Sequence, residues 1–508
     1  MKSIQGKEKI LEQCPEMLSD ESRFSMGVPD EVWFPENSSD LQELIRNAHR
    51  EKIPVTFSGA RTGITGGAVP SDGGLLISFS RMNRILECTS DPGGNPILYC
   101  EPGITLESIS RFLQNPQDWP QPVEGSEQLS PGRFFYPPDP TEMTAQLGGT
   151  VANNASGARS FHFGPTRNHI EALDIILATG DLVKLRRGEK AQKEWELTTE
   201  TVSRKIPLPS YSWPCVKNAS GFFSAPHMEP VDLFIGSEGI LGVVCAVEIR
   251  LMETPEFLSG LSFFPDRNKA FDFADFLRNQ KQLAAIEYFD SSVFDLFRES
   301  PSNDLPAIPT HLHCAVYWEY IETDDDSFEE RLEEWEDILN ECGSSLDDTW
   351  SGFEPAESSK LRTFRHAVPE LVNSKVAQNK RRHSSMRKIG TDSALPSNQF
   401  RNWFDRCMKR MEDKRIQYAV FGHLGDYHLH INMLPGTEKE LDDALSLYHD
   451  FMVDACKKGG CISAEHGIGK LKSEFLSCMF TSDALNQMKE IKRALDPQGL
   501  LNRGNLLQ

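Results

Sequence analysis

Apolar positions along this chain recur with two spacings, and each spacing predicts a kind of element. After Ser39 and Asp40, either of which can cap a helix, apolar residues fall three or four positions apart. Residues 171–185 alternate instead, which predicts a hairpin with Gly180-Asp181 at its tip. Residues 231–251 predict a strand, a tight Gly-Ser-Glu-Gly turn and a second strand.

The most informative alternation lies in residues 422–434, GHLGDYHLHINML. A strand would end near His423, turn at Gly425-Asp426 and return. On the return strand one face would carry His428, His430 and Asn432, and the other Leu429, Ile431 and Met433. Buried imidazoles need partners, so this face predicts a site that binds a metal rather than a plain core strand.

The flanking regions predict a mixed architecture. Residues 1–25 are polar and predict a helical lead-in, and beyond residue 251 strands and helices alternate. The acidic residues 327–341 predict an amphipathic helix with a solvated face. His311 and His313 alternate along a predicted strand, where a structural role is expected, and a last helix should stop at Asp496-Pro497.

Composition narrows the class of protein. With 508 residues the chain should form two or three domains, and a formal charge of −22 disfavours binding to nucleic acid or to anionic membranes. Eleven cysteines without a CxxC pair, and an N-terminus without an apolar signal, predict a cytoplasmic enzyme with free thiols. An anionic substrate would need a local basic site, and residues 360–392 concentrate Arg and Lys.

Two glycine-rich stretches suit a large ligand. Residues 58–67, SGARTGITGG, follow a short strand and can turn several backbone N–H groups toward a pyrophosphate. Their spacing matches neither GxGxxG nor the P-loop. Residues 148–157 are nearly free of bulky side chains, which lets a flat ligand approach the backbone. The alternative for residues 58–67 is a plain glycine-rich connection, and for residues 148–157 a packed crossing between elements.

Eight stretches in chain order carry a family resemblance: SGARTGITGGAVP, PPDPTEMTAQLGGTVANNASG, DLFIGSEGILGVV, FRHAVPELVN, TDSALP, GHLGDYHLHIN, GGCISAEHGIGK and LDPQGLLNRGNLL. Together they resemble the FAD-linked oxidases with the vanillyl-alcohol-oxidase flavin fold, in the D-2-hydroxyacid dehydrogenase branch. The resemblance implies an α+β fold with a PCMH-type FAD-binding domain of two subdomains, a ferredoxin-like cap that binds substrate, and a C-terminal segment returning to the flavin domain.

The implied division of the chain is a lead-in over residues 1–25, the FAD-binding domain over 26–250, the cap over 251–460 and the C-terminal segment over 461–508. FAD should be held without a covalent bond, because residues 58–67 contain no histidine. The residues implied to contact it are Ser58, Gly59, Ala60, Arg61, Thr62, Gly63, Ile64, Thr65, Gly66, Pro138, Asp139, Thr144, Gly148, Gly149, Asn153, Ala155, Gly157, Gly236, Glu238, Gly239, Gly242, Val243 and Asn502.

The resemblance also implies a substrate site. His423, His430 and Glu465 fall on the metal-binding positions of the branch, and such a ligand set suits Zn²⁺ best, with Mn²⁺ or Fe²⁺ as alternatives. His466 is implied as the base, Asn432 as substrate-facing and Arg365 as the group that binds the substrate carboxylate.

Several points stay open at this stage. His428 stands where the branch often has asparagine, so it either adds a ligand or narrows the pocket, and a role for Lys388 is doubtful. The implied partners are a small anionic 2-hydroxy acid, either D-lactate-like or D-2-hydroxyglutarate-like, and an electron acceptor: an electron-transfer flavoprotein, an iron–sulfur subunit, a quinone or a cytochrome. A homodimer is compatible with the branch. The alternatives are an enzyme like alkyl-glycerone-phosphate synthase, an oxygen-reducing flavin oxidase and a non-catalytic flavin-binding module.

Overall fold

The computed structural model describes residues 1–191, 193–299, 310–323 and 328–507. Its N-terminal sheet has the order β1-β2-β4-β3, in which β2, β4 and β3 run parallel. The strands and their helix are β1 (Lys2–Gln5), β2 (Glu31–Phe34), β3 (Val55–Ser58), β4 (Leu75–Ser78) and α2 (Ser38–Glu51). The helix predicted here is confirmed, but its cap is Asn37, whose side chain accepts the Asp40 N–H.

The second sheet is antiparallel and follows the order β5-β6-β12-β8-β9. Its elements are β5 (Ile85–Ser90), β6 (Pro96–Cys100), β8 (Ile170–Ile176), β9 (Leu182–Arg186), β12 (Val243–Arg250), α3 (Leu106–Gln114) and α4 (Leu147–Asn153). The β8–β9 hairpin confirms the predicted turn at Gly180-Asp181. Small pairs join β7 (Phe134–Phe135) to β13 (Met252–Glu253) and β10 (Glu194–Thr198) to β11 (Ser203–Pro207).

The strand predicted to open residues 231–251 is wrong, because the chain forms helix α6 (Pro230–Phe234) there. Pro230 occupies the first turn, where a missing N–H costs nothing. Glu229 and Asp232 each accept the other's backbone N–H in a capping box. These local caps outweigh the strand preference of the apolar residues.

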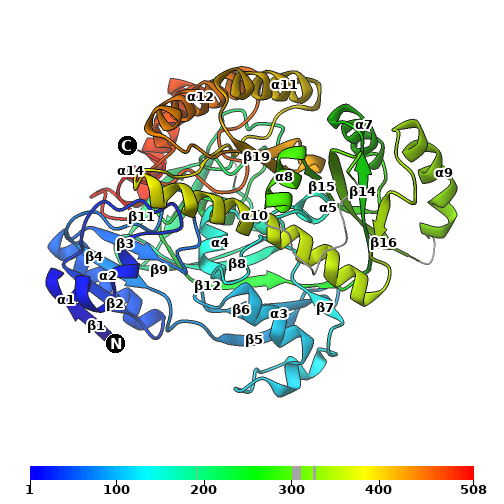
Figure 1. Cartoon of the computed structure of the whole chain (residues 1–508). Helices are drawn as coiled ribbons and strands as arrows, with labels where there is room; N and C mark the ends of the chain where they lie inside the picture. The colour runs from blue at the N-terminus through cyan, green and yellow to red at the C-terminus, as the bar shows by residue number, and fades with distance from the viewer. Residues whose placement is uncertain (192, 300–309, 324–327, 508) are drawn as a thin grey trace.

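A seven-stranded sheet with the order β17-β14-β16-β15-β19-β20-β18 fills the other half of the molecule (Figure 1). Helices cover both faces: one core joins it to α7, α9, α11 and α12, the other to α8 and α10. The bounds are β14 (Glu256–Phe264), β15 (Leu283–Phe289), β16 (Cys314–Glu322), β17 (Thr349–Ser351), β18 (Ile389–Gly390), α7 (Arg267–Leu277), α8 (Ser291–Glu299), α9 (Phe328–Glu341), α10 (Pro355–Arg382), α11 (Ser397–Lys414) and α12 (Glu438–Lys457).

The predicted hairpin is confirmed as β19 (Tyr418–His423), a 3-10 turn (Leu424–Asp426) and β20 (His428–Met433). Leu429, Ile431 and Met433 belong to the core shared with α11 and α12. The polar side chains of β20 therefore lie on the opposite face, as the alternation predicts.

Four further predictions have mixed outcomes. The lead-in is not simply helical, because β1 precedes α1 (Lys7–Gln13) and a 3-10 turn (Pro15–Leu18). His311 and His313 precede β16 rather than lying along it, so the strand predicted for them is wrong. The acidic helix is confirmed as α9, and α14 (Ser482–Leu495) ends just before Asp496.

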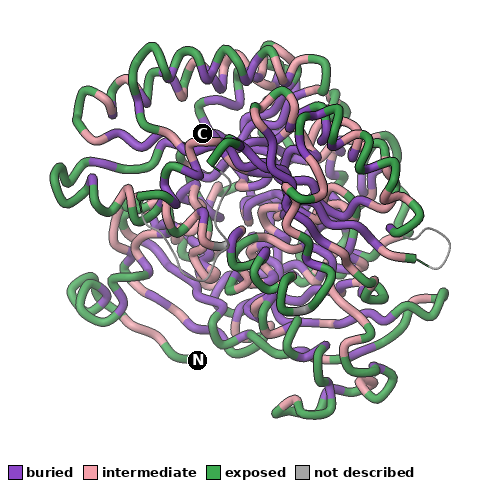
Figure 2. The backbone as a smooth tube through the Cα atoms, turned by 45° about the vertical axis from the view of Figure 1, so that its right-hand side comes forward, coloured by how far each residue is buried: buried purple, intermediate pink, exposed green. Residues whose placement is uncertain are grey.

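The C-terminal residues return to the first sheet, as expected. Leu501 bridges Val55, and Val55 exchanges backbone hydrogen bonds with Leu500 and Asn502. The sheets are buried within a more exposed layer of helices and loops (Figure 2). Among the described helices, none is long and apolar enough to cross a membrane. The domain borders themselves stay predictions.

Candidate active site

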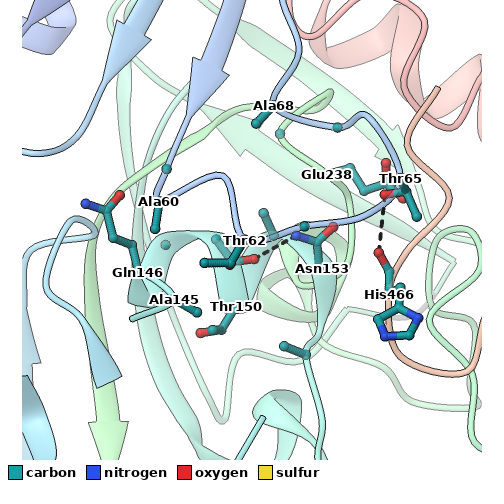
Figure 3. A pocket seen from close by; sticks show the side chains of 18 of the residues that line it. Ala60, Thr62, Thr65, Ala68, Ala145, Gln146, Thr150, Asn153, Glu238 and His466 are labelled. Atoms are coloured by element: carbon teal, nitrogen blue, oxygen red, sulfur yellow. Dashed lines mark hydrogen bonds between the residues drawn. The ribbon is translucent and has the colours of Figure 1, made fainter. Parts of the chain in front are cut away.

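One cavity of about 300 Å³ is lined by segments from both halves of the molecule. The glycine-rich loop after β3, the α4 region and the turn before β12 supply most of its lining. Three more residues come from the β19 end and from the segment before α14: His423, Glu465 and His466. In Figure 3, Thr65 of the loop lies beside His466, whose carbonyl accepts a hydrogen bond from the Thr65 hydroxyl at 3.4 Å.

Most residues predicted to contact FAD line this cavity: Gly59, Ala60, Arg61, Thr62, Gly63, Ile64, Thr65, Gly148, Gly149, Asn153, Ala155, Gly157, Glu238, Gly239, Gly242, Val243 and Asn502. We call this set the glycine wall. The structure does not bring the following predicted residues to the lining: Ser58, Gly66, Pro138, Asp139, Thr144 and Gly236. Lining residues that the sequence analysis missed include Gln146, Ser237 and Asn505.

The glycine wall leaves backbone bare toward the cavity. No hydrogen bond within the described part of the chain uses the N–H groups of residues 60–65. Because these residues line the cavity, their free N–H groups are available to an anion bound there. A Cβ added at Gly63 or Gly149 would meet nothing within 4 Å, so both positions face open space. These residues fit the pyrophosphate and flat ring of FAD.

Glu238 ties the glycine wall to the segment that carries His466. Its two carboxylate oxygens accept the N–H groups of Ile468 at 2.6 Å and Gly469 at 2.8 Å. Its own carbonyl accepts the Asn502 side chain at 2.8 Å. Both Glu238 and Asn502 hold positive φ angles, of 53° and 41°. Both residues therefore position neighbouring loops as well as lining the cavity.

Opposite the glycine wall, several imidazoles surround the carboxylate of Glu465. We call the set His423, His428, His430, His466 and Glu465 the imidazole cluster. Nε2 of His423 lies 3.3 Å from Glu465 Oε2, and Nε2 of His430 lies 3.2 Å from Oε1. His466 Nε2 and His428 Nδ1 are 3.5 Å and 3.9 Å from the same carboxylate.

Each imidazole has a second acceptor behind it. His423 Nδ1 lies 3.1 Å from Glu287, and His430 Nδ1 lies 3.3 Å from the carbonyl of Thr391. Asp392 lies 3.0 Å from His428 Nε2 and 3.0 Å from His466 Nδ1. Metal-binding histidines commonly place their second nitrogen against such an acceptor, which sets the ring orientation.

The spacing of the cluster fits a divalent cation. Donor atoms about 2.1 Å from a tetrahedral Zn²⁺ stand roughly 3.3 Å apart. The separations of His423 and His430 from Glu465 are 3.3 and 3.2 Å. Two overlapping sets have all donor atoms within 4.8 Å of one another: His423, His428, His430 and Glu465, and Asp392, His430, Glu465 and His466.

The charges of the cluster are set by its burial. Burial and the nearby Lys217 oppose protonation of His423, but Glu465 and Glu287 outweigh them and raise its pKa to about 9. Burial lowers the pKa of His428 to about 3 and also lowers that of His430. Burial also disfavours the Glu465 carboxylate, but Lys217 and His423 hold its pKa well below the usual range.

Two charged residues at the cluster, Lys217 and Asp392, are not among the site residues predicted from the sequence. Lys217 Nζ lies 2.9 Å from Glu465 and 3.6 Å from Asp426. Asp392, whose side chain is only 2% exposed, is held by Lys472 at 2.8 Å and by the Ser463 hydroxyl at 2.6 Å. Asp392 belongs to the quoted TDSALP stretch, but no local pattern distinguishes Lys217.

Arg365 and Asn432 do not reach the cavity lining. The Arg365 guanidinium pairs with Glu287 and lies 3.7 Å from Glu319. The Asn432 amide donates to the carbonyls of Ala419 and His430 at 3.3 and 3.2 Å. Their roles toward the substrate stay predictions.

Comparison with known proteins agrees with this geometry. A family profile described as "FAD binding domain" matches residues 29–128 and 124–186, and one described as "FAD linked oxidases, C-terminal domain" matches residues 256–506. The chain is 26% identical to D-2-hydroxyglutarate dehydrogenase of Stutzerimonas stutzeri, over 94% of this chain and 91% of that protein. It is also 26% identical to D-lactate dehydrogenase of Anaerostipes hadrus, over 95% and 90%.

A third relative is glycolate oxidase subunit GlcD of Bacillus subtilis, 25% identical over 94% of this chain and 89% of that protein. Among solved structures, alkyldihydroxyacetonephosphate synthase superposes with a TM-score of 0.62 over 94% of this chain and 76% of that one. At 16% identity this likeness concerns the fold alone.

Proposed function

Because this chain is a member of the FAD-linked oxidase family and an FAD-dependent oxidoreductase, we propose that it oxidises a small D-2-hydroxy acid, D-lactate-like or D-2-hydroxyglutarate-like, to the 2-oxo acid. The observation that carries the proposal is that the glycine wall and three residues of the imidazole cluster line one cavity. A substrate held by the cluster would face a flavin held by the wall.

FAD and a divalent cation would supply complementary chemistry. FAD held by the glycine wall accepts a hydride equivalent when bound. A divalent cation held by His423, His430 and Glu465 polarises substrate oxygens when bound, with Zn²⁺ the first candidate.

His466 is the base in this proposal. It lines the cavity, its side chain is 29% exposed, and its Nδ1 lies 3.0 Å from Asp392. Asp392 favours the tautomer that leaves Nε2 free to take the hydroxyl proton of the substrate, and its negative charge then stabilises the imidazolium. The salt bridge from Lys472 to Asp392, at 2.8 Å, keeps that carboxylate in place.

Binding of the substrate carboxylate is the part that the geometry supports least. Arg365 keeps this role in the proposal, although its guanidinium faces Glu287 and Glu319. The buried ammonium of Lys217, beside Glu465, is a second cation near the cluster.

Two other flavin chemistries compete with this proposal. An oxygen-reducing oxidase would share every residue described so far, so only the electron acceptor separates the two. An enzyme like alkyl-glycerone-phosphate synthase would use flavin without net oxidation. Such synthases resemble one another in a histidine-rich run at this place, whereas here Ala464 and Glu465 precede His466. This difference argues against a synthase.

The test is anaerobic bleaching of the flavin absorbance by D- and L-lactate and D- and L-2-hydroxyglutarate, with metal analysis of the same sample. Bleaching by one D-acid, in protein that holds one divalent cation per chain, is the expected result. Flavin that none of these acids bleaches would refute the dehydrogenase proposal. Bleaching in metal-free protein would refute the metal while leaving the reaction intact.

A further inference from the structure

We propose that His428 is a third imidazole ligand of the cation, so that His423, His428, His430 and Glu465 bind it together. The inference rests on the metal site of the proposed function and extends it. No resemblance assigns a role to this side chain, and the alternative is that it only fills space behind the pocket.

The burial of His428 is the first observation. Its side chain is fully buried, at 0% exposure, and it does not line the cavity. Its Nδ1 makes no hydrogen bond with any described residue, whereas Nε2 faces the Asp392 carboxylate at 3.0 Å. Buried polar atoms are almost always partnered, and leaving one alone costs about 1–3 kcal/mol. If His428 only filled space, its buried Nδ1 would stay unpartnered and the fold would bear that cost.

The orientation of the ring is the second observation. Nε2 lies 3.0 Å from Asp392, so Nδ1 is the nitrogen turned toward Glu465, at 3.9 Å. The ring centroids of His430 and His423 lie 4.6 and 5.5 Å from that of His428. His428 thus has a carboxylate behind one nitrogen and turns the other toward the space around Glu465. Metal-binding histidines have this arrangement.

His466 provides the contrast. Its Nδ1 also lies 3.0 Å from Asp392, so one carboxylate orients both rings. Yet the His466 side chain is 29% exposed and lines the cavity. The ligand set of His423, His428, His430 and Glu465, whose donor atoms lie within 4.8 Å of one another, does not include His466. The geometry thus separates a buried ligand, His428, from an accessible base, His466.

A four-residue ligand set changes the expected metal. Four protein donors complete a tetrahedral Zn²⁺ site, and such closed sites are structural. Substrate oxygens could then reach the cation only if it accepts five or six donors, as Mn²⁺, Fe²⁺ and Co²⁺ do readily. We therefore expect the catalytically competent protein to favour one of these ions over Zn²⁺.

The decisive experiment counts imidazoles on the cation. X-ray absorption fine structure is recorded on the full chain with FAD and one equivalent of Co²⁺, for the wild type, His428→Phe and His466→Phe. Phenylalanine keeps an aromatic ring at each position but offers no ring nitrogen. We expect three imidazoles on the Co²⁺ in the wild type and in His466→Phe, and two in His428→Phe. The Co²⁺ dissociation constant of His428→Phe should rise at least about 100-fold, since loss of an outer-shell partner alone costs 10–100-fold.

Any other result of this experiment would identify which part of the proposal is wrong. Two imidazoles in the wild type, or an unchanged count and affinity in His428→Phe, would overturn the inference and leave His428 as packing. A wild-type count of three that falls to two only in His466→Phe would make His466 the third ligand. If the wild type binds no Co²⁺, the metal of the proposed function fails as well. Should His428→Phe not fold with FAD, the wild-type and His466→Phe counts still decide.

Discussion

The two sides of the cavity differ in the groups that they present to a ligand. The glycine wall works through missing side chains: residues 60–65 present free N–H groups, and Gly63 and Gly149 leave space open. The imidazole cluster consists of crowded side chains, with four histidine rings around Glu465 and a carboxylate or carbonyl oxygen behind each ring. The first side is therefore defined by open space and free donors, and the second by charge and ring nitrogens.

The difference predicts which substitutions should weaken ligand binding on each side. Added bulk on the glycine wall should expel FAD and leave the cation in place. A changed charge or nitrogen in the imidazole cluster should release the cation and leave FAD bound. Contacts that join the two sides include those of Glu238 with Gly469 and of Thr65 with the His466 carbonyl.

The largest effect is expected from His423→Ala and His466→Ala. Each should lower kcat by more than about 1,000-fold, since the first removes a ligand and the second the base. Only His423→Ala should lose the cation, measured as metal per chain after dialysis, while both keep the FAD spectrum. Stoichiometric metal in His423→Ala at the wild-type rate would refute the assignment of that ligand.

Arg365→Met should have the next largest effect, on stability. It leaves the buried Glu287 facing Glu319 without their shared cation, which should cost about 3 kcal/mol of unfolding free energy in urea. The matched control on the same helix is Lys375→Met, whose partner Glu299 is 52% exposed, with an expected cost below about 1 kcal/mol. Equal losses would contradict the buried-network role, and a raised KM with unchanged stability would favour the carboxylate-binding role.

Gly149→Val tests the glycine wall. The added side chain would enter the cavity, and an overpacked site of this kind costs about 1–3 kcal/mol, or roughly 10–100-fold in FAD affinity. Gly436→Val, away from the cavity, is the control, because its Cβ would meet only ordinary contacts at 3.6 Å or more. Fluorescence titration of FAD into apoprotein measures both, and unchanged affinity in Gly149→Val would place the ligand elsewhere.

The smallest effect, about tenfold for each pH unit, is a pH dependence confined to the imidazole cluster. In metal-free protein His423 has a pKa of about 9, so it is protonated at pH 7 and must lose one proton to bind a cation. Affinity for the cation should therefore rise about tenfold per pH unit up to pH 9 and then level off, with about one proton released. Calorimetry in buffers of different ionisation heat counts the proton, and FAD affinity should not follow this profile.

Local features were predictable because they depend on neighbours in the chain. The period of two along β20 sets His428 and His430 on one face whatever the rest of the fold does. The glycine-rich composition of residues 58–67 likewise predicted a bare backbone. The failures were local as well, as at α6, where the capping box of Glu229 and Asp232 outweighed apolar alternation.

From the sequence alone we could predict the family and the candidate site residues His423, His430, Glu465 and His466. The charged groups around these residues became apparent only in the folded chain. Lys217 and Glu465 are 248 positions apart, and no periodicity relates them. Their contact, and the sharing of Asp392 between His428 and His466, arise because loops of one half pack on the sheet edge of the other. Burial in that junction removes water, so each charge must find its partner in the protein itself.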